Sequence, residues 1–135
     1  MTFPPDALLA AMAHCEAAYP NEGCGVFVRE PSGAIRAVPI TNVSPTPRTA
    51  FLMDPNEQLR IFGGPDPVVC VFHSHVDADA AFSEADRRLA LADGQPVLPG
   101  VRYLVLSIRA KTVEIRAFSW TGANFEEASV PLPRR

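Results

Sequence analysis

The chain has 135 residues, of which 47% are hydrophobic, and a formal net charge of −3. This size suits one domain with a sizeable core, so we expect residues 1–135 to form a single domain. The mildly acidic composition disfavours a nucleic-acid partner, and no apolar run reaches the roughly 18 residues of a membrane span. Three widely spaced cysteines argue against a disulfide framework. Because the N-terminus also lacks the basic region of a signal peptide, we expect a cytoplasmic protein.

The first half of the chain predicts a helix, two strands and a second helix. Residues 4–6 (Pro-Pro-Asp) suit a helix start, and the apolar stripe that follows ends before Pro20. Two strands joined by a hairpin are predicted at 24–29 and about 34–40. A short helix is predicted from 54 to about 62, with an aspartate as its N-cap.

The second half predicts a buried strand, a helix and a final group of strands. Residues 68–72 are apolar throughout, so we expect this strand to be buried on both faces. A helix is predicted to begin at Ser83 and to end at Gly94, with an apolar stripe at Phe82, Ala85, Leu89 and Ala92. Further strands are predicted at 101–108, at 111–120 and, at the sheet edge, within 125–135. This order predicts an α/β fold of three layers, with a mixed central β-sheet flanked by helices.

Two histidines directly follow the buried strand. His73 and His75 are one residue apart, and strand side chains alternate between faces, so the two imidazoles point the same way. Asp86 lies in the first turn of the next predicted helix, where its carboxylate can face the strand end. A catalytic zinc ion typically has three protein ligands and keeps a fourth position for water. We therefore predict a Zn²⁺ site at His73, His75 and Asp86. The metal would lower the pKa of a bound water molecule, so that hydroxide is available near neutral pH.

The proton transfer requires a group outside this stretch, and Glu22 is the candidate general base. Each candidate also has an ordinary structural explanation. Ser83-x-x-Asp86 is a helix-capping pattern, and Glu22 by itself is a surface acid in a turn. The combination of the two histidines with the capping pattern favours the metal site over these separate explanations.

Taken together, these residues resemble the signature of the JAMM/MPN+ metalloprotease family, in particular its small prokaryotic members. The pattern is E…H-S-H-x7-S-x2-D, filled by Glu22, His73, Ser74, His75, Ser83 and Asp86. The resemblance covers most of the chain and implies a cytidine-deaminase-like fold. It also implies zinc held by the two histidines, Asp86 and water, with Glu22 as proton shuttle and the Ser83 hydroxyl stabilising the oxyanion. Val76 stands where the family usually has proline, a change that removes no chemical group.

The resemblance implies a zinc metallopeptidase that hydrolyses a peptide or isopeptide bond. The bond would follow the C-terminal Gly-Gly of a ubiquitin-like or sulfur-carrier protein, which would be the partner of this chain. The short connection at 95–99 resembles a minimal catalytic domain. An extended tail would reach the metal through a narrow groove, and residues 51–53 are a possible sheet edge for it.

Three other functions agree with parts of the sequence. A zinc nucleobase deaminase needs a P-C-x-x-C element besides H-x-E, and the sequence has no P-C-x-x-C. A structural zinc site usually has four protein ligands, and no fourth candidate follows from the sequence. A non-catalytic scaffold or ubiquitin-like binding module of the same fold is the remaining alternative, and metal content distinguishes it from the enzyme.

Overall fold

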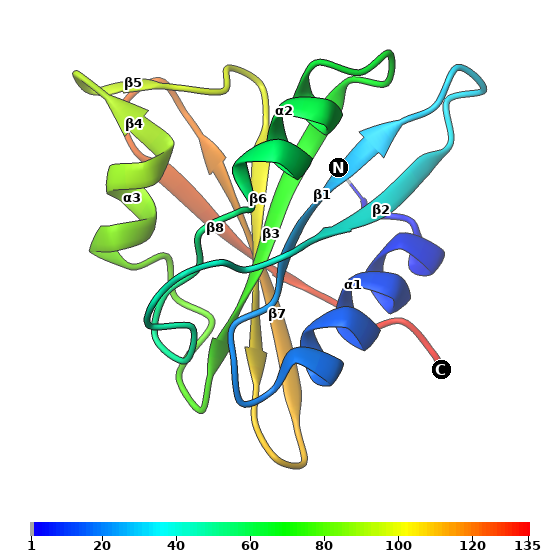
Figure 1. Ribbon diagram of the computed structural model, residues 1–135, viewed down its shortest axis with the longest axis vertical. Helices are drawn as coiled ribbons and strands as arrows, with labels where there is room; N and C mark the ends of the chain where they lie inside the picture. Colours follow the sequence, from blue (N-terminus) through cyan, green and yellow to red (C-terminus); the bar gives the residue numbers. More distant parts are fainter. Residues whose placement is uncertain (1) are drawn as a thin grey trace.

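The computed structural model describes residues 2–135, which form a six-stranded mixed sheet with helices on both faces (Figure 1). The strands of this sheet are β1 (Cys24–Arg29), β2 (Ile35–Ile40), β3 (Val68–Val76), β6 (Arg102–Ile108), β7 (Val113–Trp120) and β8 (Phe125–Val130). The helices are α1 (Pro5–Ala18), α2 (Pro55–Phe62) and α3 (Glu84–Ala90). A small separate hairpin pairs β4 (Leu91–Ala92) with β5 (Gln95–Pro96).

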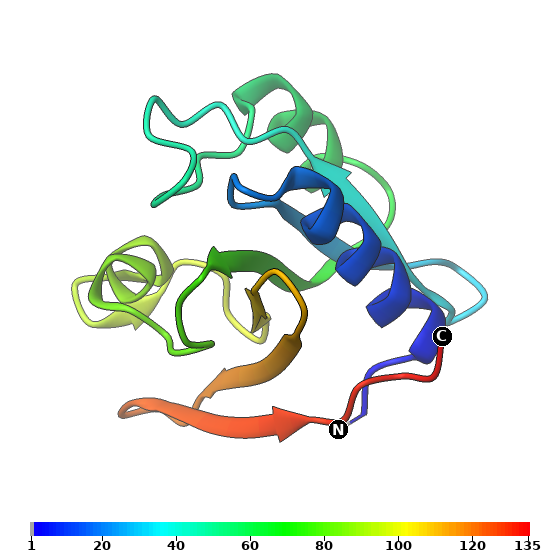
Figure 2. The same ribbon diagram turned by 90° about the horizontal axis from the view of Figure 1, so that it is seen from below.

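The strand order is β2-β1-β3-β6-β7-β8, and every neighbouring pair is antiparallel except β3 and β6. Helix α1 covers one face of the sheet, and α3 lies on the other (Figure 2). The predicted three-layer α/β fold with a mixed sheet is therefore confirmed. No helix within residues 2–135 combines the length and the apolar character that crossing a membrane requires.

Strand alternation divides the core into two clusters, one on each face. In β3, Cys70 and Phe72 pack in the cluster beneath α1, whereas Val71 packs in the cluster on the opposite face. His73 and His75 continue the series of Val71, because side chains two residues apart share a face. The register of β3 thus directs both imidazoles to the face that carries α3.

Strand β3 is longer than the apolar run predicted. It continues to Val76 beside β6, with His73 opposite Val105 and His75 opposite Ser107. The histidines therefore lie within a paired central strand, not beyond its end. His73 is paired with strands on both sides and His75 with β6, which fixes the two imidazoles more firmly than a loop would.

Helix α3 differs from its prediction in length and in orientation. It ends at Ala90 and not at Gly94, because Leu91 and Ala92 are extended and pair with β5. The predicted apolar stripe is also wrong: of Phe82, Ala85, Leu89 and Ala92, only Phe82 is buried. The helix buries Asp86 and Ala90 instead. The inward face carries a carboxylate that a hydrophobic pattern does not reveal.

The last strands agree with their predictions. β6 and β7 form a hairpin whose turn is closed by a hydrogen bond from Arg109 N to Thr112 O at 3.0 Å. β8 is the edge strand beside β7. After β8 the chain crosses to α1, where Arg135 forms an ion pair with Glu16 at 2.9 Å. This ion pair holds the C-terminal segment against α1.

Candidate metal centre

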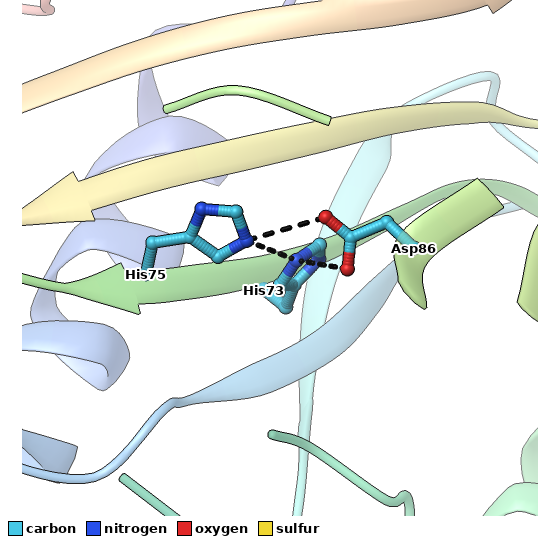
Figure 3. Close-up of side chains that lie close together, drawn as sticks. All are labelled: His73, His75 and Asp86. Atoms are coloured by element: carbon cyan, nitrogen blue, oxygen red, sulfur yellow. Dashed lines mark hydrogen bonds and ion pairs between the residues drawn. The ribbon is translucent and has the colours of Figure 1, made fainter. Parts of the chain in front are cut away.

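Three side chains from β3 and α3 converge on one point (Figure 3). The Nε2 atoms of His73 and His75 are 3.2 Å apart. The carboxylate of Asp86 reaches His73 Nε2 with Oδ1 at 3.1 Å and His75 Nε2 with Oδ2 at 3.2 Å. The ligand atoms all lie within 4.8 Å of one another, so this triad can hold a metal ion.

The spacing of these atoms fits a tetrahedral metal ion. Bond lengths of about 2.0–2.1 Å in tetrahedral geometry place two ligand atoms about 3.3 Å apart. The two imidazole Nε2 atoms are 3.2 Å apart, which is close to this value, and each lies 3.1–3.2 Å from a different oxygen of the Asp86 carboxylate. Two imidazole nitrogens and one carboxylate are also the ligand types that zinc accepts, so the residues present fit the metal that the sequence predicts.

Neighbouring groups orient both imidazoles. The Nδ1 of His75 lies 2.8 Å from the carbonyl oxygen of Asp79, which only accepts hydrogen bonds. Nδ1 is therefore the donor in this hydrogen bond, which leaves Nε2 as the nitrogen that would bind a metal. The His73 ring stacks on Phe51, with ring centroids 4.4 Å apart and planes 25° from parallel. Its Nδ1 is buried without a hydrogen-bond partner among residues 2–135.

The charges of the triad suit metal binding. Burial lowers the pKa of His73 and keeps this imidazole neutral. Burial also acts to lower the pKa of His75, but the hydrogen bonds to Asp86 and to the Asp79 carbonyl and the nearby negative charges together outweigh it, so the pKa of His75 is raised. Burial opposes ionisation of Asp86, yet the hydrogen bonds to both histidines hold the pKa of its carboxyl well below its usual range. The site thus contains an ionised carboxylate, as metal ligation requires.

Ser83 and Asp86 form a capping box at the start of α3. The Ser83 Oγ accepts a hydrogen bond from Asp86 N at 3.1 Å, and Asp86 Oδ2 accepts one from Ser83 N at 2.9 Å. The cap fixes the rotamer of Asp86, so capping and metal ligation use the same geometry. The hydroxyl proton of Ser83 is not used by the cap and can be donated to another acceptor.

Glu22 is buried and lies close enough to the triad for its charge to interact with His75 and Asp86. Its side chain is only 6% exposed, so it is not the surface acid that its position in a turn suggested. Burial raises the pKa of Glu22 to about 7, with His75 opposing and Asp86 reinforcing the change. A carboxyl with this pKa exchanges protons near neutrality, as a general base must.

An apolar groove of about 540 Å³ leads to the triad between α2 and α3. It is lined by Phe51, Leu52, Met53, Pro55, Gln58, Leu59, Phe62, Val71, His73, Phe82, Asp86, Leu89, Val97, Leu98 and Tyr103. Leu59 is 75% and Leu89 58% exposed, so the rim presents large apolar side chains to solvent. The sequence predicted residues 51–53 near such a groove, but no local pattern indicated that α2 and α3 form its walls.

The family model described as prokaryotic homologues of the JAB domain matches residues 4–121. A protein of Haloferax volcanii named desampylase is 33% identical over 119 residues, which cover 84% of this chain and 79% of that protein. A Mycobacterium tuberculosis protein named CysO-cysteine peptidase is 32% identical over 112 residues, covering 77% of this chain and 70% of the other.

A solved structure shares the whole fold. The solution structure of a Desulfitobacterium hafniense protein superposes with a TM-score of 0.71 at 26% identity, and covers 99% of this chain and 93% of that one. The resemblance that the sequence predicted is confirmed by the family match and by both relatives. The chain belongs to the family of prokaryotic JAB-domain homologues, the JAMM/MPN group.

Proposed function

We propose that this chain is a zinc-dependent metallopeptidase that cleaves a peptide or isopeptide bond after the C-terminal Gly-Gly of a ubiquitin-like or sulfur-carrier protein. The observation that carries the proposal is the convergence of His73, His75 and Asp86, whose ligand atoms lie within 4.8 Å of one another. The names of the two relatives, a desampylase and a CysO-cysteine peptidase, support the reaction class. We assign the whole chain to one catalytic domain. Three buried unpaired cysteines support the cytoplasm as its compartment.

His73, His75 and Asp86 would hold the zinc ion, which when bound would polarise the scissile carbonyl and acidify a water molecule. Glu22 takes the proton from the attacking water and passes it to the leaving amine, a role that suits a pKa of about 7. Ser83 donates its hydroxyl proton to the oxygen of the tetrahedral carbon while its Oγ continues to accept from Asp86 N. Burial of the triad excludes competing water and strengthens these interactions.

The groove supplies a path for the substrate's tail. The bridge between Asn42 and Met53 uses hydrogen bonds from Val43 N to Leu52 O and from Asp54 N to Thr41 O. These bonds leave the amide and carbonyl of Met53 free of partners within residues 2–135, so an extended tail can pair with this edge. The two terminal glycines would lie next to the triad, and the apolar walls would take the residues upstream.

The test uses a Gly-Gly-ended carrier protein fused to a short C-terminal extension. We expect cleavage after the second glycine, loss of cleavage with a chelator and recovery with zinc. The Glu22→Gln variant separates metal binding from proton transfer. We expect it to retain zinc, because Glu22 is not a proposed ligand, and to lose cleavage. A protein that binds no zinc and cleaves none of the carriers contradicts the proposal and favours the non-catalytic scaffold.

A further inference from the structure

The side chain of Asn42 joins two parts of the site that are far apart in the sequence. Its Nδ2 donates to Glu22 O at 2.9 Å and to Ala50 O at 3.1 Å. Its Oδ1 accepts from Ser44 N and from Leu52 N, both at 3.0 Å. Two donated and two accepted bonds are the full capacity of an amide side chain, so every polar position of Asn42 is used.

One side of this connection is the backbone of Glu22. The turn that carries Glu22 has a second attachment to the same loop, from Glu22 N to Pro47 O at 2.7 Å. The next residue, Gly23, is held separately by Ser74 of β3, through Gly23 N to Ser74 Oγ at 2.8 Å and Ser74 N to Gly23 O at 2.9 Å. Ser74 therefore fixes the turn to the sheet, and Asn42 fixes it to residues 44–52.

The other side of the connection is the wall of the groove. Residues 44–52 end in Phe51, which stacks on His73, and in Leu52, which lines the groove and is 50% exposed. A ligand in the groove must contact this segment. Any displacement of Leu52 acts directly on Asn42, because Leu52 N is one of its four hydrogen-bond partners.

We propose that Asn42 is a positioning residue that couples the occupied groove to the general base, by tying the backbone of Glu22 to the segment that contacts the substrate's tail. The inference rests on the proposed function, in which Glu22 moves the proton and the groove takes the tail. In a chain without this link, the tail would still bind and the metal would still be held, but the Glu22 carboxylate would lose its alignment with the reacting atoms. Loss of this link would therefore lower kcat and leave KM unchanged.

Asn42→Asp removes the two hydrogen bonds that Asn42 donates and retains the two that it accepts. An aspartate retains an oxygen to accept from Ser44 N and Leu52 N, but it cannot donate to Glu22 O or Ala50 O. We expect kcat for the Gly-Gly carrier fusion to fall on the order of ten- to a hundredfold, as a misplacement of about 1 Å costs. Zinc content should not change, KM should stay within about twofold of wild type, and the low-pH limb of the kcat profile should move.

Ser44→Ala is the matched control for general loosening of the same segment. It removes the hydrogen bond from Thr46 N to Ser44 Oγ and leaves all four bonds of Asn42 in place. We expect wild-type kcat. The link also predicts non-additivity: Leu52→Ala should lower kcat in the wild-type chain and have little further effect in Asn42→Asp. Wild-type kcat in Asn42→Asp, or an equal loss in Ser44→Ala, overturns the proposal.

A measurement on the wild-type chain tests the link even if the Asn42 variant does not fold. A short peptide ending in Gly-Gly, added to the zinc-loaded protein, should slow hydrogen exchange at the Glu22 amide and leave the remote Thr121 amide unchanged. No change at Glu22 with the peptide bound overturns the coupling. If the wild-type chain cleaves and Glu22→Gln does not, this failure concerns Asn42 alone. A wild-type chain that neither binds zinc nor cleaves overturns both proposals.

Discussion

Glu22 shows how burial turns an ordinary carboxyl into a group that titrates near neutral pH. Its 6% exposure deprives the carboxylate of hydration, and the nearby charge of Asp86 adds to the cost of ionisation. The turn is held to the sheet through Ser74, which fixes the backbone from which the Glu22 side chain extends. In the folded chain, ionisation of the Glu22 carboxyl is therefore less favourable than in water, at the position where the proposed mechanism needs a base.

This burial predicts a pH-dependent stability difference in the metal-free protein. A carboxyl whose pKa rises on folding contributes stability that is present in full below its ordinary value of 4.5 and lost as the pH rises through about 7. Glu22→Gln removes this loss. We expect its free energy of unfolding to exceed that of wild type increasingly from pH 5 to pH 8, by on the order of 2 kcal/mol at the upper end.

Urea denaturation in the presence of a chelator measures this difference. The same titration with Glu126→Gln is the control, because Glu126 is an exposed carboxyl on β8. A stability difference for Glu22→Gln that does not change between pH 5 and pH 8 contradicts the buried, neutral-pH carboxyl.

At the scale of single elements, α3 combines a helix start with a metal ligand. Its seven residues have little intrinsic stability as a helix, so the capping box is a large part of what defines its first turn. The short length also places its C-terminal end at the β4–β5 hairpin, where Leu89 is left on the rim of the groove. In the proposed mechanism a single short helix would thereby contribute a metal ligand, a hydroxyl and part of the substrate path.

The two roles of Ser83 can be separated by substitution. Ser83→Ala should lower the free energy of unfolding by about 1 kcal/mol and also lower kcat, because it removes both cap and hydroxyl. Ser83→Gly should cost only a few tenths of a kcal/mol, since glycine is tolerated as an N-cap, and yet lose the same activity. Ser83→Thr should retain both. Thermal denaturation and kcat measured side by side check this order; full activity in Ser83→Gly would remove the hydroxyl from the mechanism.

The elements that the sequence predicted correctly are those whose periodic apolar pattern matches their burial. Helix α1 buries Leu8, Met12 and Cys15, as its spacing predicts. The errors occur where the site itself lies. The phase of α3 was wrong because Asp86 faces inward, and the end of β3 was wrong because two histidines continue a buried strand. Hydrophobic periodicity fails where polar side chains are buried for a ligand.

Local sequence patterns also do not predict which residues from distant parts of the chain contact the site. Glu22 was a candidate by resemblance, but its burial follows from the pairing of β1 with β3, which no spacing within the turn encodes. Asn42 was not identified at all, because an asparagine before a proline-rich loop has many ordinary explanations. Its role depends on four backbone groups that only the folded chain brings together.

At the scale of the whole molecule, the metal would connect the central strand to the layer of helices above it. His73 and His75 belong to β3, and Asp86 belongs to α3, with a loop between them whose Asp79 is tied by an ion pair to Arg109 at the end of β6. The cluster under α1 on the other face does not include these residues. A bound ion therefore stabilises the α3 face in particular.

Zinc should accordingly raise the melting temperature of the protein. At a thousandfold excess over its dissociation constant, a ligand specific for the folded state adds about 4 kcal/mol, or roughly 10 °C for a domain of this size. Differential scanning fluorimetry of the chelated protein, with and without added zinc, measures the shift. Asp86→Asn should reduce it strongly, whereas Asp77→Asn, outside the triad, should leave it unchanged. Equal shifts in both variants would indicate that zinc binds elsewhere.

The alternation of β3 has a consequence for insertions and deletions. Odd-numbered residues from Val71 to His75 face α3, and Cys70 and Phe72 face α1. Deleting one residue before His73 would turn each later side chain of β3 to the opposite face of the sheet. The imidazoles would then point into the apolar cluster under α1, and Ser74 would point toward the proposed metal site. Deleting two residues would return each side chain to its original face and would shift the two histidines by two residues along the strand. Homologous chains should therefore show almost no single-residue change in the length of this strand.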